Sequence, residues 1–443
     1  MEAFMKSILP AGELNQFFIN PESMVDADVD FTGTIYKIKN LGQFSFVHLS
    51  TLAGIFQSVI TGECSLKEGS SIHVWGKVVT AKLKDKVLAS KTIEIQISKW
   101  KTLSTHYESS PFDLTKPELN IHNDVLFDQR MISLRHPREK AIFKIQEALG
   151  EGFRRALRKR GCTELRTPKI VKEGAEGGAN IFELNYFGQP AYLTQSPQFY
   201  KEFGVGIFER VFEIAPVFRA EKHNTSRHLN EYISVDAEIG NISSFEEVMA
   251  FETGVLKEVF EFLKLECSFE LELLGISLKE FESIPSLTFK EVKVIVSREF
   301  GIHEENEPDL SPQEELKISE WALSQWGSDF LFVTHYPSEK RPFYAMDSEV
   351  NPEESLSFDL LYRGVEITTG GQRIHEYEAI VNKLKRRGMN PEHFEFFIKA
   401  HRYGLPPHGG FGLGLERLTQ KIIGLESVKR CSLFPRDISR LSP

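Results

Sequence analysis

Short runs in which apolar and polar residues alternate fill the chain between about residues 29 and 101. Turn residues separate five such runs, at residues 31–36, 44–49, 54–60, 71–79 and 93–97. Alternation with a period of two predicts strands that bury one face. Five short strands in one segment predict a small closed barrel of the OB-fold kind, an architecture that binds oligonucleotides on one face.

The pattern changes to a helical period further along the chain. Residues 102–129 show no clear period and contain Ser109-Ser110-Pro111 and Lys116-Pro117, so we expect a linker there. Residues 140–160 carry apolar side chains at helical spacing and leave a basic face outside. This segment therefore predicts one long amphipathic helix.

The rest of the chain mixes strands and helices without a regular βαβ rhythm. Strand-like runs lie between residues 191 and 240, and residues 358–367 predict one further strand. Helical patterns occur at residues 244–263 and 312–325. This order favours an antiparallel α+β domain. We therefore expect three parts: an OB-fold domain over residues 1–101, a linker over 102–129 and an α+β domain over 130–443.

Composition places the chain among ordinary globular proteins, with 41% hydrophobic and 26% charged residues. The first residues lack the basic start and apolar core of a secretory leader, and no apolar run is long enough to span a membrane. The four cysteines form no C-x-x-C pair, which argues against a disulfide framework and a thiolate zinc site. We expect a cytoplasmic protein without membrane contact.

The net charge of −10 hides an asymmetry along the chain. Residues 31–100 contain nine Lys or Arg against four Asp or Glu, whereas residues 101–443 contain 43 against 53. The predicted barrel is thus the basic part of the protein. A basic barrel is compatible with a phosphate-bearing partner, although lysines on short strands are more often solvated edges.

The chain has no G-x-x-x-x-G-K-[ST] loop, so a nucleotide would have to be bound by other residues. Two segments carry residues suited to this role. Residues 218–232 place arginine, histidine and glutamate side chains around a polar turn. Residues 409–418 run from a glycine-dense strand into a helix that begins with an arginine. Glycines let a ligand approach the backbone, and a guanidinium can stack on a base while its charge meets phosphate. Each segment alone is weak evidence, because surface ion pairs and glycine turns are common.

Together with an upstream segment, these residues resemble the three motifs of the class II aminoacyl-tRNA synthetases. Residues 161–168 resemble motif 1, residues 218–221 with 227–231 resemble motif 2, and residues 412–417 resemble motif 3. The predicted barrel and the ending Leu433-Phe434-Pro435-Arg436-Asp437 narrow the resemblance to the aspartyl, asparaginyl and lysyl subgroup. The resemblance implies an OB-fold anticodon domain followed by a class II antiparallel catalytic domain.

The segment Gln195–Glu202 is similar to that of the aspartyl enzymes, in which the lysine, here Lys201, faces the side-chain carboxylate of the substrate. A charge-assisted hydrogen bond there would favour aspartate over its amide by roughly 1.5–3 kcal/mol. Arg373 resembles the residue that clamps the same carboxylate. Ala175 and Thr369 stand where the family often has serine. The resemblance assigns aspartate binding to Glu176, Gln198, Lys201, Asp236, Thr369 and Arg373.

The resemblance also implies an ATP site that needs no protein nucleophile. Arg219 would hold the α-phosphate, and Tyr232 and Arg417 would sandwich adenine, so Arg219 and Arg417 are the expected catalytic residues. Asp359 and Glu366 resemble a pair of carboxylates that binds Mg²⁺ on the triphosphate. The implied ATP-binding set is Arg219, Glu221, His223, Arg227, Tyr232, Glu366, Gly414 and Arg417.

In the predicted barrel, Phe46, Gln57 and Glu94 resemble the anticodon readers of the family. An aromatic ring can stack on an unpaired base, and amide and carboxylate groups can bond to base edges. Tyr36 stands where strict archaeal-type enzymes tend to carry tryptophan and relaxed ones histidine. Tyrosine is neither, so this position leaves the choice of tRNA open.

These features predict an aspartate–tRNA ligase of the archaeal and eukaryotic type, since residues 241–355 are too few for the large insertion of the common bacterial form. The expected partners are L-aspartate, ATP with Mg²⁺ and tRNA-Asp. The short barrel favours charging of tRNA-Asn as well, which would need a downstream amidotransferase. Motif 1 forms the dimer interface in the family, so we expect a homodimer.

Two alternatives remain at this point. One is an asparaginyl-tRNA synthetase, which Lys201 and Asp236 oppose. The other is a non-catalytic RNA-binding paralogue in which the ATP site has decayed, and the presence of Arg219, Glu366 and Arg417 counts against it.

Overall fold

A computed structural model describes residues 16–172, 180–222, 224–304 and 307–442. The chain forms two compact units, Met1–Lys140 and Ala141–Pro443. All four cysteines lie within the described residues, and each is buried and takes no part in a disulfide bond. None of the described helices combines the length and the apolar character that crossing a membrane requires.

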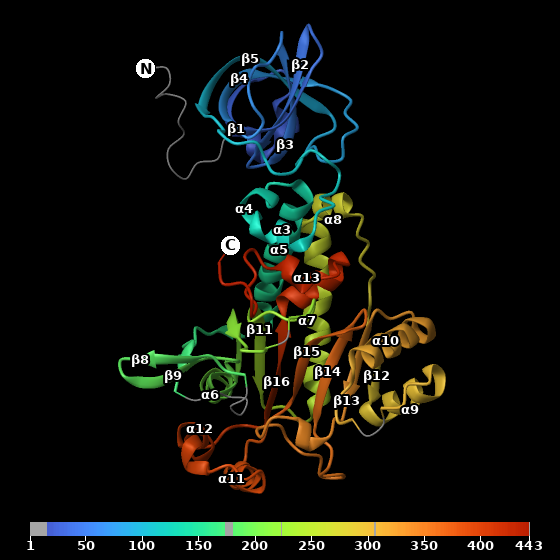
Figure 1. The fold of residues 1–443 in the computed structure, drawn as a ribbon. Coiled ribbons are helices and arrows are strands. Elements are labelled where there is room, and N and C mark those ends of the chain that lie inside the picture. The colour runs from blue at the N-terminus through green and yellow to red at the C-terminus, as the bar shows by residue number, and fades with distance from the viewer. Residues whose placement is uncertain (1–15, 173–179, 223, 305–306, 443) are drawn as a thin grey trace. The chain divides into compact units, whose positions relative to one another are not determined.

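The first unit contains a closed barrel of five strands in the order β1-β2-β3-β5-β4 (Figure 1). Strands β3 and β5 pair in parallel, and the other neighbours are antiparallel. Apolar side chains at alternate positions, such as Val47, Leu49 and Ile95, fill the interior. The predicted OB-like barrel is therefore confirmed. Its strands are β1 (Asp28–Asn40), β2 (Phe44–Thr51), β3 (Gly54–Thr61), β4 (Ser71–Thr80) and β5 (Ile93–Ser104).

Short elements flank the barrel on both sides. Before it, Phe17 in helix α2 (Gln16–Ile19) stacks on Phe31, with ring centroids 4.8 Å apart. A 3₁₀ helix, η1 (Pro21–Met24), follows α2. After the barrel come α3 (Asn123–Asp128) and α4 (Arg130–Ser133), so the segment that we expected to be a linker contains one short helix.

An eight-stranded sheet forms the centre of the second unit, in the order β12-β13-β14-β15-β16-β11-β10-β6. Only the two outermost pairs, β12 with β13 and β10 with β6, are parallel. The predicted antiparallel α+β class is confirmed. The strands are β6 (Thr163–Glu164), β10 (Arg210–Phe218), β11 (Glu231–Gly240), β12 (Ser286–Thr288), β13 (Phe330–Thr334), β14 (Ser357–Tyr362), β15 (Val365–Gln372) and β16 (His408–Gly414).

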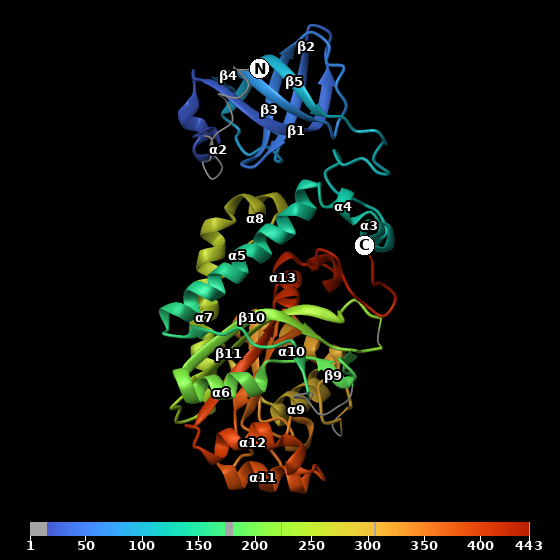
Figure 2. The same cartoon turned by 90° about the vertical axis from the view of Figure 1, so that its left-hand side faces the viewer.

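Alternation along the strands gives this sheet one apolar and one polar face. On β11, Val235 and Ala237 point into a hydrophobic core that also contains side chains of α5 (Pro137–Lys159) and α7 (Phe245–Glu266). Figures 1 and 2 show both helices against the same side of the sheet. Asp236, between those two residues, points to the opposite face. The polar face is thus left open for a ligand.

The run 358–367, which we expected to be a single strand, is a hairpin. Arg363 and Gly364 both have positive φ angles, 48° and 82°, and they reverse the chain between β14 and β15. Two successive left-handed residues fit the tight turn between antiparallel strands. This correction places Asp359 and Glu366 on neighbouring strands rather than along one strand.

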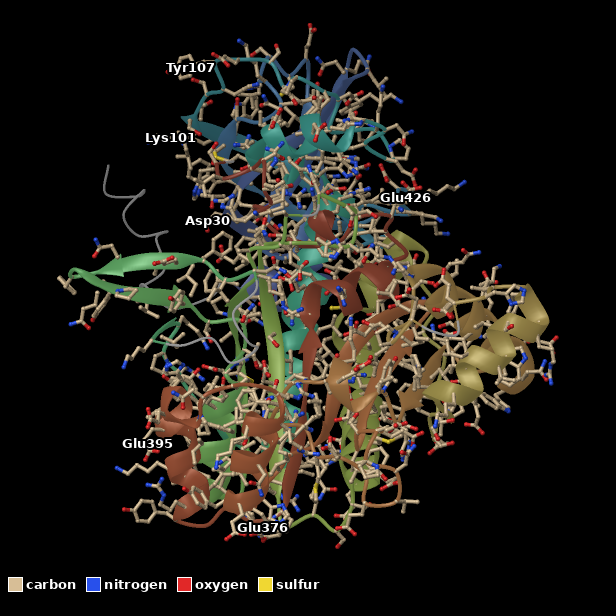
Figure 3. All side chains as sticks on the ribbon, turned by 60° about the horizontal axis from the view of Figure 1, so that its bottom comes forward. Asp30, Lys101, Tyr107, Glu376, Glu395 and Glu426 are labelled. Atoms are coloured by element: carbon tan, nitrogen blue, oxygen red, sulfur yellow. The ribbon has the colours of Figure 1, made fainter. Side chains whose placement is uncertain are left out.

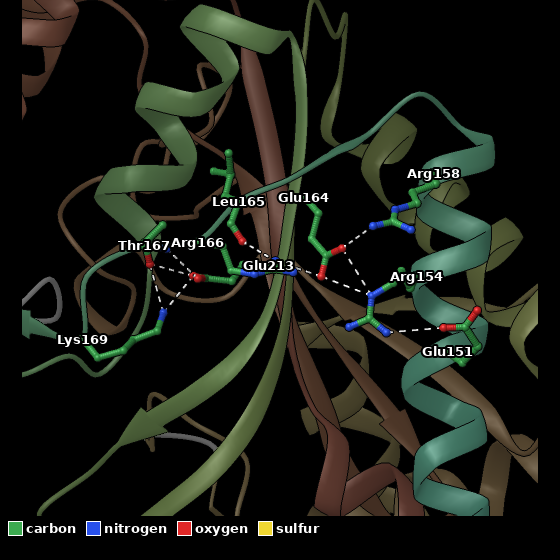
Figure 4. A network of polar contacts seen from close by, with 9 residues as sticks. All are labelled: Glu151, Arg154, Arg158, Glu164, Leu165, Arg166, Thr167, Lys169 and Glu213. Atoms are coloured by element: carbon green, nitrogen blue, oxygen red, sulfur yellow. Dashed lines mark hydrogen bonds and ion pairs between the residues drawn. The ribbon is translucent and has the colours of Figure 1, made fainter. Parts of the chain in front are cut away.

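A network of ion pairs anchors the chain where it leaves α5 and enters the sheet (Figure 4). The carboxylate of Glu164 contacts Arg154 at 3.2 Å, Arg158 at 2.8 Å and Arg166 at 2.9 Å. Glu213 on β10 accepts hydrogen bonds from the backbone and the hydroxyl of Thr167. Part of the basic face of α5 is therefore used inside this unit.

The remaining elements surround the sheet. Strands β7 (Ile170–Val171), β8 (Glu183–Tyr186) and β9 (Gln189–Leu193) form a separate small sheet. The predicted helices at 244–263 and 312–325 are confirmed as α7 and α10 (Pro312–Trp326). The other helices of this unit are α6 (Gln198–Phe208), α8 (Ser268–Leu274), α9 (Phe289–Phe300), α11 (Tyr377–Arg386), α12 (Glu395–Arg402) and α13 (Leu415–Ile423), with 3₁₀ helices η2 (Ser338–Lys340), η3 (Pro391–Phe394) and η4 (Val428–Cys431).

Candidate active site

A cavity of about 250 Å³ lies on the polar face of the second unit's sheet. Strands β11, β15 and β16, helix α6 and the start of α13 contribute to its walls. Residues that are far apart in the sequence therefore meet around one space. The predicted site residues among its lining are Gln198, Lys201, Arg219, Glu221, Arg227, Tyr232, Asp236, Glu366, Thr369, Arg373, Gly414 and Arg417.

Lys201 lies at the buried end of this cavity, on the first turn of α6, with its side chain 1% exposed. Its Nζ donates to Asp236 Oδ1 at 2.8 Å and to the carbonyl oxygen of Phe411 at 3.1 Å, and Glu238 Oε2 lies 3.4 Å away. Three acceptors thus surround an ammonium group that has three donors. Pairing with these partners offsets the cost of burying the charge and fixes its position.

Arg373 continues the same charged group from the end of β15. Its Nε donates to Glu238 Oε1 at 3.0 Å, and its Nη2 donates to the carbonyl oxygen of Gly410 at 2.9 Å. Although burial raises the pKa of Glu238, Arg373 and Lys201 hold that pKa below its usual value. Lys201, Arg373, Asp236 and Glu238 therefore form a compact charged cluster with two charges of each sign.

The glycines of β16 are needed by this cluster as well as by any ligand. A Cβ added to Gly410 would lie 2.3 Å from Glu238 Oε2, and one added to Gly412 would lie 3.1 Å from Asp236 Oδ1. We expected these glycines to let a ligand approach the backbone. At these two positions the structure shows that they first make room for acidic side chains from the neighbouring strand.

Arg219 lies at the turn that joins β10 and β11. Its backbone N–H donates to the carbonyl oxygen of Asn230 at 2.9 Å, which closes the base of the turn. The guanidinium carbon lies 5.7 Å from the ring centroid of Tyr232, and Nη1 lies 3.9 Å from Glu221 Oε1. A guanidinium and a tyrosine ring held over one cavity suit the recognition of a nucleotide.

Arg417 faces the same space from the first turn of α13. Its Nη1 donates to the carbonyl oxygen of Glu366 at 3.1 Å and lies 3.6 Å from the Glu366 carboxylate. Thr369 donates through its hydroxyl to Glu366 Oε1 at 2.8 Å. These contacts orient the Glu366 carboxylate, which still lines the cavity.

Arg227 lines the cavity while bonded to a residue beside it. Its Nη1 donates to Glu315 Oε2 at 3.0 Å, and its Nη2 donates to the carbonyl oxygen of Gly364 at 3.4 Å. Burial, with a contribution from Glu366, raises the pKa of Glu315 to about 7 against the opposing charge of Arg227. Glu315 on α10 therefore helps to fix the position from which Arg227 reaches the cavity.

Asp359 lies beside the cavity, and its contacts suit a metal ligand. Its Oδ2 accepts a hydrogen bond from Arg341 at 2.8 Å, whereas its buried Oδ1 has no hydrogen-bond partner among the described residues. Burial, with a smaller contribution from Glu366, raises the pKa of Asp359 to about 6 although Arg341 opposes the shift. An orphaned carboxylate oxygen near a second carboxylate fits a hard cation. No three His, Cys, Asp or Glu residues cluster for a metal within the described ranges, so a ligand would have to complete the shell.

The predicted anticodon readers share the outer face of the barrel in the first unit. Gln57 on β3 donates to Glu94 on β5 at 2.8 Å, and Phe46 lies on the neighbouring strand β2. Phe46 and Gln57 are both partly exposed. The hydroxyl of Tyr36 donates to the carbonyl oxygen of Leu114 at 2.8 Å, so this side chain is already engaged within the unit.

Two predicted residues, Glu176 and His223, lie outside the described residues. Two further residues belong to the site but were not assigned from the sequence. Glu238 follows Asp236 by two positions on one strand, so strand periodicity could have placed both on the same face. No sequence pattern singles out Arg341, because it lies in an irregular segment. Only its ion pair with Asp359 in the structure identifies it.

The chain was also compared with known protein families. Residues 122–438 match the family described as tRNA synthetases class II (D, K and N). The chain belongs to this family. In this class II synthetase, residues from the segments 218–232 and 409–418 meet at the cavity on the antiparallel sheet.

Individual relatives cover nearly the whole synthetase. An "Aspartate--tRNA(Asp/Asn) ligase" of Thermus thermophilus is 43% identical over 421 residues, which are 95% of this chain and 97% of the relative. An "Aspartate--tRNA(Asp) ligase" of Pyrococcus abyssi is 37% identical over 95% of this chain and 98% of the relative. Among solved structures, asparaginyl-tRNA synthetase from Pyrococcus horikoshii complexed with asparaginyl-adenylate is similar with a TM-score of 0.87 and 28% identity, covering 98% of this chain and 100% of that one.

Proposed function

We propose that this synthetase is an aspartate–tRNA ligase, which activates L-aspartate with ATP and transfers it to the 3′ end of tRNA-Asp. The observation that carries the proposal is the pair of buried cations, Lys201 and Arg373, at one end of the cavity. The relatives from Thermus thermophilus and Pyrococcus abyssi, both named for aspartate, support the same amino acid.

A carboxylate suits this end of the cavity better than an amide does. Nε and Nη2 of Arg373 have partners, and its Nη1 has no hydrogen-bond partner in the part of the chain that the structure describes. Both oxygens of a carboxylate can accept hydrogen bonds from the Nη1 group of Arg373. The NH₂ group of an amide is itself a donor, so it would face the N–H groups of Arg373 without forming a bond. One charge-assisted hydrogen bond is worth roughly 1.5–3 kcal/mol, or roughly ten- to a hundredfold in binding.

The proposed reaction has two steps. The α-carboxylate of aspartate attacks the α-phosphorus of ATP, and the bond to the bridging oxygen breaks as pyrophosphate leaves. A terminal ribose hydroxyl of the tRNA then attacks the carbonyl carbon of the mixed anhydride and releases AMP. Arg219 and Arg417 neutralise charge on the phosphates, Tyr232 and Arg417 hold adenine, and no protein nucleophile takes part.

Asp359 and Glu366 are the residues that we propose for Mg²⁺. The orphaned Oδ1 of Asp359 and the cavity-lining carboxylate of Glu366 provide the hard oxygen ligands that this ion prefers. When bound with ATP, the ion would offset negative charge on the triphosphate. Arg341 keeps the second oxygen of Asp359 in place.

We propose that the barrel reads the anticodon through Phe46, Gln57 and Glu94, and that tRNA-Asn is charged as well as tRNA-Asp. The two tRNAs share the first two anticodon letters and differ at C36 against U36. The relative from Thermus thermophilus, which is 43% identical and named for both tRNAs, supports this proposal. Charged Asp-tRNA-Asn would need a downstream amidotransferase.

Charging purified tRNA-Asp and tRNA-Asn transcripts side by side tests the dual specificity. We expect kcat/KM values for the two tRNAs to lie within about a hundredfold of each other. If tRNA-Asn is charged more than about a thousandfold less efficiently, equivalent to about 4 kcal/mol, the enzyme is strict for tRNA-Asp.

We also propose a homodimer that uses the motif 1 segment, residues 161–168, as in the family that the sequence resembles. Light scattering after size-exclusion chromatography should give twice the chain mass of 50.6 kDa. A single-chain mass at micromolar concentration would contradict this assembly.

Aspartate-dependent exchange of pyrophosphate into ATP separates the proposed function from its rivals, because it needs no tRNA. Aspartate should support exchange, and asparagine should support it at least about tenfold less efficiently. Exchange with asparagine alone would identify an asparaginyl enzyme. No exchange with either amino acid would favour the non-catalytic paralogue.

A further inference from the structure

A fully buried pair of ionisable side chains lies behind the aspartate end of the cavity without lining it. Glu202 is on α6, one residue after Lys201, and His408 begins β16. Both side chains are 0% exposed, and Glu202 Oε2 lies 3.4 Å from His408 Nε2. None of the steps proposed above uses either group.

The contacts of His408 fix where its protons are. Its Nδ1 lies 2.8 Å from the carbonyl oxygen of Pro406, which can only accept, so Nδ1 carries a hydrogen. Its Nε2 faces the Glu202 carboxylate, and two lone pairs facing each other in a buried site would repel. A second proton therefore lies between Nε2 and Oε2, and the pair is an imidazolium beside a carboxylate. The 3.4 Å separation makes this an ion pair rather than a strong hydrogen bond.

Each member of the pair contacts a residue of the proposed aspartate site. Glu202 Oε1 accepts a hydrogen bond from Gln198 Nε2 at 2.8 Å. The carbonyl oxygen of His408 accepts from the backbone N–H of Arg373 at 2.9 Å. Two positions along β16, Gly410 accepts from the Arg373 guanidinium. The pair thus supports both sides of the pocket, through α6 and through β16.

Other charged groups face His408 from the elements around it. Burial lowers the pKa of His408, but Glu202 and Glu238 raise it above its usual value overall. Nε2 of His401 on α12 lies 3.9 Å from Glu202 Oε2. Burial lowers the pKa of His375, and His408 and His401 contribute to this shift although Glu376 opposes it. On the same helix, Glu395 is exposed at the surface (Figure 3), whereas His401 is buried.

We infer that Glu202 and His408 are positioning residues that couple aspartate binding to a proton held between them. The inference rests on the proposed aspartate site. With the proton present, the pair is neutral overall and holds Gln198 and the start of β16 in place. When His408 loses the proton at higher pH, an uncompensated buried carboxylate is left close to the site that must accept the substrate carboxylate. Aspartate binding then weakens, while ATP binding is unaffected.

The variant Glu202→Gln tests this coupling with little change of shape. The introduced amide can accept from Gln198 through its carbonyl oxygen and donate to a neutral His408 through its NH₂ group, so no proton needs to be held. In the wild type, the KM for aspartate in pyrophosphate exchange should rise by about fivefold or more between neutral pH and pH 9, at the low end of coupling between linked sites. The ratio of the wild-type KM to that of Glu202→Gln should therefore change with pH, and the KM for ATP should not show this change.

A matched control uses another buried carboxylate of the same unit. Glu314 on α10 pairs with Lys293 at 2.9 Å and has no contact with the cavity. Glu314→Gln is expected to lower stability but to keep the wild-type pH dependence of the KM for aspartate. A merely structural role of Glu202 would make the two variants behave alike.

A second measurement on the wild type does not depend on how the variants fold. Calorimetric titration with aspartate in two buffers of different ionisation enthalpy reports proton uptake, which we expect near and above the pKa of His408. No uptake at any pH between about 7 and 9.5, or the same pH dependence of KM in wild type and Glu202→Gln, would overturn the inference. If the wild type shows no aspartate-dependent exchange at all, the proposed function fails instead, so the two failures are distinguishable.

Discussion

Replacing Lys201 by methionine separates two roles of this side chain, as a counter-charge for Asp236 and as a contact for substrate. Asp236 is 4% exposed, and its hydrogen bond from Lys201 is 2.8 Å long. Removing one partner of such a buried pair costs about 3–5 kcal/mol of unfolding free energy. Glu238 loses less, because Arg373 still contacts it.

The effect on activity should be of a different size and kind. If Lys201 also meets the substrate carboxylate, the lost charge-assisted hydrogen bond lowers kcat/KM for aspartate by roughly ten- to a hundredfold, while the KM for ATP stays within about twofold. Pyrophosphate exchange and urea unfolding measure the two quantities on the same preparation.

The double variant Lys201→Met with Asp236→Asn gives the decisive comparison. It removes both charges, so it should recover much of the stability that the single variant loses, with a coupling energy of about 1–3 kcal/mol. Exchange should remain low. If exchange in Lys201→Met stays within about threefold of the wild type, or returns in the double variant, Lys201 only balances Asp236 and the substrate contact is wrong.

Three further predictions concern other parts of the chain. Asp359→Asn and Glu366→Gln should each abolish adenylate formation and weaken binding of Mn²⁺ in the presence of ATP, measured by electron paramagnetic resonance, and unchanged binding would make both residues structural. Burial raises the pKa of Glu252 to about 8, so between about pH 4.5 and pH 8 the folded state keeps a proton that the unfolded state releases. The unfolding free energy should therefore fall by up to about 1.4 kcal/mol per pH unit in this range. Urea titrations should show a flatter slope for Glu252→Gln. Phe46→Ala should raise the KM for tRNA about tenfold by loss of stacking and leave pyrophosphate exchange unchanged. Leu52→Ala, at an exposed position of the same barrel, is the control. Equal effects of the two substitutions on the KM for tRNA would count against base stacking by Phe46.

The barrel and the long helices were predictable because their patterns are local. Alternating residues such as those of β2 can only bury one face of a strand, and the spacing in α5 can only bury one face of a helix. The hairpin of β14 and β15 was missed because neither strand shows a regular alternation of buried and exposed positions: β14 is buried throughout, and β15 is buried at most positions although it carries polar residues. The signal was Arg363-Gly364, a pair that a left-handed turn accepts.

The candidate site could be predicted only as far as its motifs reach. Residues that share a motif, such as Arg219 and Tyr232 or Gly414 and Arg417, were found together. The pairings of Arg341 with Asp359 and of Glu202 with His408 were not found, because Arg341, Glu202 and His408 lie outside the motifs and these contacts depend on how the strands are ordered in the sheet. Sequence spacing carries no information on such contacts.

Charging of a tRNA-Asp transcript with radiolabelled amino acid tests the central claim most directly, since it requires the cavity, the ATP site and the barrel together. We predict that aspartate is attached in an ATP-dependent reaction and that asparagine, at the same concentration, is attached at least about tenfold more slowly. Preferential attachment of asparagine, or no attachment of aspartate by a folded preparation, would contradict the account.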